Sequence, residues 1–140
     1  MDKKWWVERS SAKMWVGHNS RGSSVVMAPS DAGVPGSFTP GELLKLALGG
    51  CAGMTSEGPA ARRLGDDYTA TIVIDGTDHE TEDRYQAFTE HILIDAATLD
   101  QAGRDALIAS MARAIDHSCT VGLTVRNGAS VTVTIEDAPS

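Results

Sequence analysis

Two cysteines are the residues of this chain with the most distinctive chemistry. Cys51 lies in the sequence LALGGCAGM, and Cys119 lies in HSCTVGLTV. A free cysteine often only fills space in a core, because cysteine is among the most buried residue types. Two thiols that meet in the fold can instead form a transient redox pair, in which one sulfur attacks a substrate and the other closes a disulfide. From these residues alone, both interpretations stay open.

His117 lies two residues before Cys119, so two other kinds of site have to be considered. A metal site needs three or four ligands with clear spacing, and the remaining histidines are the scattered His18, His79 and His91. A cysteine–histidine hydrolase needs a hydrogen-bonded nucleophile and base, which two residues this close on a turn rarely form. We therefore expect no metal site, and we assign His117 to the C-terminal end of a helix, where it interacts with the helix dipole.

The composition is that of an ordinary globular protein. The chain has 140 residues, of which 41% are hydrophobic and 22% charged, and this predicts a single domain over residues 1–140. A net charge of −7 argues against nucleic acid and against an anionic membrane surface as partners. The charged N-terminus lacks the apolar stretch of a secretory signal, and Leu46–Ser56 is too short to span a bilayer. We expect a cytoplasmic protein.

The first cysteine falls on a predicted helix with a clear start. Thr39 and Glu42 have the spacing of a capping box, so we expect the helix to begin there and to end at Leu64, with Gly65 as its cap. Gly58-Pro59 is expected to kink or interrupt it. Apolar residues at spacings of three and four predict one inward stripe, made of Leu43, Leu44, Ala47, Leu48, Cys51 and Met54.

The remaining segments predict an α+β fold with two main helices packed on antiparallel sheets. We expect three short strands within the first 28 residues, a loop over 29–38, strands over 68–75 and 87–94, a second helix over 100–116, and a final strand over 129–136. The charged run His79–Arg84 is predicted to be a solvated hairpin loop. Adjacent residues of a strand face opposite ways, so Trp5 or Trp6 should be exposed unless a partner covers it.

The two cysteine-bearing segments resemble a known family. The stretch TPGELLKLALGGCAGMTS, followed about 70 residues after its cysteine by SCTVGLTV, is similar to osmotically inducible protein C (OsmC) and the organic hydroperoxide resistance proteins. The resemblance extends over nearly the whole chain. It implies an intertwined homodimer with active sites at the interface, and a thiol-dependent peroxidase of oxidative stress defence that uses no metal or cofactor.

The resemblance also implies roles for the two thiols. Cys51 would attack an organic hydroperoxide, and Cys119 would resolve the resulting sulfenic acid as a disulfide. An external dithiol, with a lipoylated protein as one candidate, would then reduce the disulfide. The apolar residues around Cys51 favour bulky organic peroxides over hydrogen peroxide.

Burial alone would keep Cys51 protonated, so a cation is expected nearby. Members of the resembled family use an arginine from an early strand or turn, held by a glutamate ten residues before the first cysteine. Arg21 is our candidate for this cation, with Arg9 as the fallback. The position of the glutamate is Gly41 here, and Glu42 follows it. Glu42 is therefore predicted either to orient the arginine or to serve only as the capping-box acid.

A second departure follows the second cysteine. Family members often have Cys-Pro-Val, whereas Thr120 replaces the proline here and frees a backbone N–H for capping a short helix. Together with Gly41, this leaves a rival prediction open. In that alternative the protein is a non-catalytic OsmC-like member that binds a small hydrophobic ligand, and its thiols are largely inert.

Overall fold

The computed structural model describes residues 2–138, and the chain forms two compact units that are each described by themselves. One unit holds the chain up to Ala47 together with Ile74–Glu90. The other unit holds Leu48–Val73 together with the chain from His91 onward. The division cuts across helix α1 (Pro40–Leu64) and across the hairpin of β5 (Ala70–Asp78) and β6 (Tyr85–Ile94). The prediction of one domain over residues 1–140 stays a prediction.

The N-terminal sheet has the order β1-β2-β3-β4. Its strands are β1 (Trp5–Ser11), β2 (Met14–Asn19), β3 (Ser24–Met27) and β4 (Ser37–Phe38). The first three pair antiparallel, as expected, whereas the two-residue β4 pairs parallel with β3. Strand β4 lies within the segment 29–38 that we had expected to be loop throughout.

The tandem tryptophans face opposite ways, as predicted for adjacent strand residues. Trp6 stacks on His18 of β2, with the ring centroids 5.2 Å apart. The side chain of Trp5 is 77% exposed. Trp15 on β2 is also largely exposed. The sheet therefore presents large apolar side chains that this unit does not cover.

Helix α1 begins as the sequence predicts. The backbone N–H of Glu42 donates to Thr39 Oγ1 at 3.1 Å, and the Thr39 N–H donates to Glu42 Oε1 at 2.7 Å, which completes the capping box. Gly65 ends the helix with a positive φ of 89°. Gly58-Pro59 was expected to kink or interrupt the helix; the interruption is wrong, because the helix continues through Pro59, and the kink stays a prediction.

The buried face of α1 differs from the predicted stripe. Leu44, Ala47 and Met54 were expected to point inward, but all three are exposed, and the Met54 side chain is 81% exposed. The buried residues are mostly small: Leu48, Ala52, Ser56 and Ala60, which are spaced four apart, and Gly49 next to Leu48. Small side chains on one helix face let a neighbouring element approach the backbone closely, which explains why glycine and alanine are frequent in this helix.

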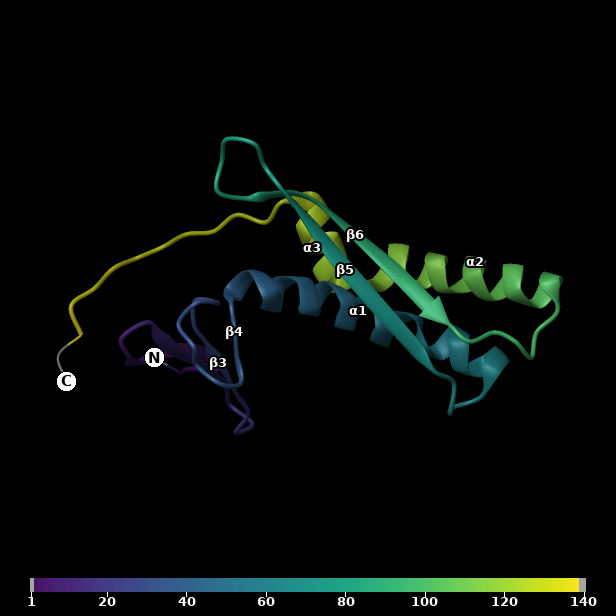
Figure 1. Ribbon diagram of the computed structural model, residues 1–140, viewed down its shortest axis with the longest axis horizontal. Coiled ribbons are helices and arrows are strands. Elements are labelled where there is room, and N and C mark those ends of the chain that lie inside the picture. Colours follow the sequence, from purple (N-terminus) through teal and green to yellow (C-terminus); the bar gives the residue numbers. More distant parts are fainter. Residues whose placement is uncertain (1, 139–140) are drawn as a thin grey trace. The chain divides into compact units, whose positions relative to one another are not determined.

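The β5–β6 hairpin follows α1, and its two long strands run side by side (Figure 1). The predicted loop His79–Arg84 joins them, and the His79 N–H donates to the Arg84 carbonyl oxygen at 2.8 Å. Helix α2 (Gln101–Ser118) comes next, with Asp100 Oδ1 accepting from the Gly103 N–H at its start. Leu107 and Met111 of α2 form a core with Ala60 of α1.

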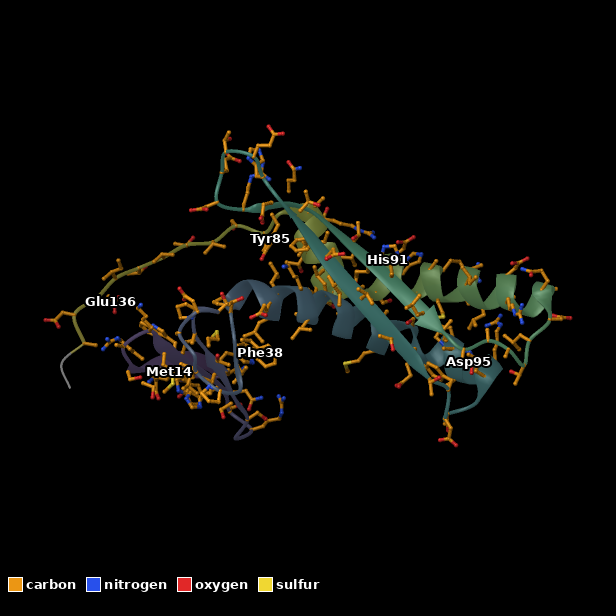
Figure 2. All side chains as sticks on the ribbon, viewed as in Figure 1. Met14, Phe38, Tyr85, His91, Asp95 and Glu136 are labelled. Atoms are coloured by element: carbon orange, nitrogen blue, oxygen red, sulfur yellow. The ribbon has the colours of Figure 1, made fainter. Side chains whose placement is uncertain are left out.

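Two features after α2 differ from the predicted fold. The chain forms a third helix, α3 (Thr120–Asn127), which ends at Gly128 with a positive φ of 65°. The predicted strand over 129–136 is wrong, because this segment has no strand pairing. The segment instead runs as an extended yellow trace, with Glu136 near its end (Figures 1 and 2). A strand requires a neighbour that accepts its backbone hydrogen bonds, and the alternating pattern alone does not supply one.

Among residues 2–138, no helix combines the length and the apolar character needed to cross a membrane.

Candidate active site

The two cysteines lie in the same unit, one within helix α1 and the other at the start of helix α3. Cys51 is in the middle of α1, and Cys119 is the N-cap residue of α3, immediately after α2. The Cys119 thiol donates a hydrogen bond to the Cys51 sulfur, so the two side chains are neighbours. Neither is in a disulfide. The structure thus brings together two thiols that are far apart along the sequence.

Three further groups donate to the Cys51 sulfur. Two are backbone N–H groups at the start of α3, those of Thr120 and Val121, and the third is the Thr55 hydroxyl, one turn further along α1. The Val121 N–H lowers the pKa of Cys51 most, partial burial raises it, and the Cys119, Thr55 and Thr120 donors lower it further. The net effect is a pKa below the ordinary value, because hydrogen bonds to the thiolate outweigh its desolvation.

The two sulfurs differ in their access to solvent. Cys51 is partly exposed, whereas the side chain of Cys119 is only 2% exposed. A Cβ on Gly122 would lie 3.2 Å from the Cys119 sulfur, so the glycine leaves room for this thiol inside the first turn of α3. An external reagent can therefore reach Cys51, while Cys119 is shielded beside it.

The sequence did not point to Thr55 or to the Val121 amide, and it suggested the Thr120 N–H only as a cap for a short helix. Thr55 carries a recognisable signal, since it is four residues after Cys51 and therefore on the same side of the helix. The amides of Thr120 and Val121 carry no signal of residue type, because every residue except proline has a backbone N–H. Only the replacement of the family's proline by Thr120 pointed to an additional donor at this position.

Arg21 lies in the other unit, in the turn between β2 and β3. Its backbone N–H donates to Asn19 Oδ1 at 2.9 Å, and its side chain is exposed. Within residues 2–138, Arg21 takes part in no ion pair. Its role as the cation that ionises Cys51 stays a prediction, and so does the fallback on Arg9.

The structure gives Glu42 the capping role that the sequence offered as one of its two functions. Its carboxylate accepts from the Thr39 N–H and so completes the capping box. The orienting role toward an arginine stays a prediction.

The packing around position 41 within its own unit explains why a glycine occupies it. A Cβ at position 41 would lie 2.5 Å from the Tyr85 hydroxyl oxygen, which is closer than Cβ contacts in real structures. The Tyr85 ring is held by the Lys45 ammonium group, which lies 4.8 Å from the ring centroid. Tyr85, labelled in Figure 2, therefore fills the space that a glutamate at position 41 would need.

Each unit has an apolar groove, and neither groove is lined by a cysteine. The first, of about 590 Å³, lies beside the end of β6 and one face of α2, and it includes Ile94, Arg104 and Ile108. The second, of about 460 Å³, lies on the N-terminal sheet and includes Lys13 and Trp15. Within residues 2–138, no cluster of three or more histidine, cysteine or acidic side chains could hold a metal ion.

Some known proteins are similar to this chain in sequence, and others are similar to it in fold. Residues 33–134 match the family of OsmC-like proteins. Uncharacterised proteins of Mycobacterium bovis and Mycobacterium tuberculosis are each 39% identical over 132 residues, covering 94% of this chain and 95% of theirs.

Two solved structures show the same fold at low sequence identity. A hypothetical protein from Aquifex aeolicus superimposes with a TM-score of 0.69 at 17% identity, covering 91% of this chain and 90% of its own. An OsmC-like protein from Mycoplasma pneumoniae gives 0.65 at 13% identity, covering 91% of each chain. On the evidence of the matched residues, this α+β chain belongs to the OsmC-like protein family.

Proposed function

We propose that the protein is a thiol-dependent peroxidase that reduces organic hydroperoxides in defence against oxidative stress. The observation that carries this proposal is the hydrogen-bonded pair of Cys51 and Cys119, in which the accessible thiol has a lowered pKa. A thiolate is the nucleophilic form of cysteine, and a second thiol within reach protects its oxidised product. A chain with two unrelated core thiols would not need this arrangement.

The chemistry proceeds in two balanced steps. The Cys51 thiolate attacks the terminal oxygen of ROOH, so that an S–O bond forms, the O–O bond breaks, and RO⁻ leaves and takes up a proton to become the alcohol. The Cys119 thiol then condenses with the sulfenic acid, which forms the S–S bond and releases water. Together these steps oxidise two thiols and reduce one hydroperoxide by two electrons.

An external dithiol completes the cycle in this proposal. It exchanges with the Cys51–Cys119 disulfide, becomes a disulfide itself, and returns both protein thiols to the reduced form. A lipoylated protein is one partner of this chemical class. Arg21 as the activating cation, and Glu42 as its orienter, are retained as predictions that rest on the family resemblance.

Titration of the reduced protein with cumene hydroperoxide tests the proposal. About one equivalent is expected to convert both thiols into one intramolecular disulfide, with a mass loss of about two daltons. Intact-mass spectrometry and peptide mapping would identify the Cys51–Cys119 linkage, and a sample without peroxide is the control. Two free thiols that persist after the peroxide has been added in excess would contradict the proposal.

A non-catalytic binder of a small hydrophobic ligand is the second candidate function. The observation that favours it is the apolar groove beside β6 and α2, because such concave surfaces commonly bind apolar molecules. The same titration separates the two candidates. A binder would leave the peroxide unconsumed, whereas the proposed enzyme reduces it.

We infer that the protein acts as a homodimer. The support is the segment 129–136, in which Val131, Val133 and Ile135 alternate with polar residues and are 85%, 77% and 94% exposed. An extended segment with an uncovered apolar face is suited to pairing with a second chain. The exposed Trp5 on the edge strand β1 adds apolar surface for the same purpose.

The dimer is expected to depend on the apolar face of this segment. Val133→Asp should shift the mass measured by size exclusion with light scattering from twice the 14.8 kDa chain mass toward the single chain, because it places a charge in an apolar contact. Thr132→Asp is the matched control, since it adds the same charge on the opposite face. A wild-type protein that elutes as a monomer, or equal effects of the two variants, would contradict the inference.

A further inference from the structure

One face of the N-terminal sheet carries the apolar groove of about 460 Å³. Val7 of β1, Trp15 of β2 and Met27 of β3 line it. The strand register brings them together, because Trp15 pairs with Met27 on one side and with Arg9 on the other, and Arg9 shares a face with Val7. Val7 and Trp15 are 52% and 45% exposed, so the groove offers an accessible indole ring beside aliphatic side chains.

The charges around this groove are positive. Residues 1–28 contain five lysine or arginine residues and two acidic ones, in a chain whose net charge is −7. Lys13 lines the groove, and Arg9 lies on the same face of the sheet beside Trp15. Glu8 is on the opposite face, where its carboxylate lies 3.7 Å from His18 Nε2.

The two cations on this face have no acidic partner. None of the residues that line the groove is acidic. Within residues 2–138, neither Lys13 nor Arg9 takes part in an ion pair. The face therefore combines an apolar surface with positive charge that is open to an external anion, and such complementarity favours an anionic ligand.

The backbone of Lys13 gives a second reason to assign it a function. Its φ is 63°, and it is the only residue other than glycine with a positive φ within residues 2–138. Glycine, asparagine or aspartate adopts this conformation at lower cost than lysine. Backbone strain of this kind is concentrated at functional sites. Here the residue that carries it supplies the one cationic side chain that lines the groove.

We propose that this groove binds a small aromatic carboxylate, whose flat apolar body lies on Trp15 and whose carboxylate is held by Lys13. The volume suits a small organic molecule, and flat rings pack well on an exposed indole. Pro29 and Pro40 also line the groove, and their fixed φ angles make its wall rigid before a ligand arrives. This binding goes beyond the proposed peroxidase function and does not depend on it, because no cysteine lines the groove.

Titration of the full-length protein with 2-naphthoate, followed by ¹H–¹⁵N NMR of the three tryptophan indole N–H groups, tests the proposal. Loss of one signal in Trp15→Phe assigns the Trp15 indole. We expect 2-naphthoate to shift this signal and to leave Trp6, which stacks on His18 on the other face, unchanged. The neutral analogue 2-naphthamide has nearly the same shape and should bind about three- to tenfold more weakly.

Lys13→Gly separates a binding role from a structural one. Glycine accepts a positive φ, so the unfolding midpoint should stay the same or rise. The affinity for 2-naphthoate should fall about three- to tenfold, to that of the amide. Lys3→Gly is the matched control, because it removes the same charge from an exposed residue that does not line the groove, and it should retain the wild-type affinity.

An unchanged Trp15 signal, equal affinities for the acid and the amide, or equal losses in Lys13→Gly and Lys3→Gly would overturn the proposal. Binding to Val133→Asp but not to the wild type would also overturn it, because a second copy of the chain would then cover the groove. A lower unfolding midpoint for Lys13→Gly would assign this lysine a structural role and would equally count against the proposed site.

Discussion

Cys51→Ser is expected to reduce peroxide consumption to the uncatalysed background. A serine hydroxyl does not ionise near neutral pH and cannot be oxidised to a sulfenic acid. Both the attack on the peroxide and the formation of the disulfide are therefore lost. The rate of loss of cumene hydroperoxide in the presence of excess dithiothreitol is the measurement. Residual activity within about tenfold of wild type would mean that another group attacks the peroxide, and would contradict the proposed role of Cys51.

Cys119→Ser is the informative comparison for that result. This variant keeps the nucleophile but loses the thiol that condenses with the sulfenic acid, so we expect one turnover followed by over-oxidation of Cys51. Intact mass should rise by about two oxygen atoms as the peroxide is increased, because sulfinic acid is the next stable product. A variant that cycles like wild type with dithiothreitol, without over-oxidation, would show that resolution does not require Cys119.

The second large effect concerns stability. Leu107 is fully buried, with 0% exposure, and packs with Ala60 and Met111. Leu107→Ala is expected to lower the free energy of unfolding by about 2–5 kcal/mol, because it removes apolar contacts and leaves a cavity. Urea unfolding of the reduced protein at one fixed protein concentration measures this change, since oligomers unfold in a concentration-dependent way.

Ile108→Ala is the control for the stability measurement. Ile108 is the next residue of α2, and its side chain is 63% exposed. Its truncation should change the free energy of unfolding by about 0.5 kcal/mol or less. Equal losses for the two variants would mean that the core does not centre on Leu107, or that a partner chain covers Ile108.

Local sequence predicted the elements whose signals are themselves local. The start of α1 follows from Thr39 and Glu42, and its end follows from Gly65, because caps act within one turn of the chain. The hairpin loop His79–Arg84 was also predicted from local sequence. The structure of segment 129–136 was not predicted correctly. Its alternation of apolar and polar residues indicates an apolar face but does not indicate which strand would pair with it.

Helix α3 shows why the rest of the fold was harder to predict. Its sequence, TVGLTVRN, is rich in β-branched residues and contains Gly122, so helix propensity alone does not favour it. At its start, the N–H groups of Thr120 and Val121 donate to the Cys51 sulfur. Those bonds join residues far apart along the chain, so no local pattern could reveal them.

The same limit applied to the site. Cys51 and Cys119 were identified by their resemblance to family motifs, and the structure makes them neighbours. The groups that tune the first thiol are two amides and the Thr55 hydroxyl, and backbone amides leave no trace in residue type. Their contribution could be recognised only once α1 and α3 had been brought together in three dimensions.

The packing of Tyr85 against Gly41 has a consequence for exchanging parts between relatives. A glutamate grafted at position 41 would force the Tyr85 side chain to move, because the incoming side chain and the phenol ring compete for one volume. A smaller residue at position 85 in the same molecule would make that room, and it would also leave the Lys45 ammonium group without its aromatic contact. In this chain, three positions from two distant stretches of sequence are therefore coupled: 41, 45 and 85.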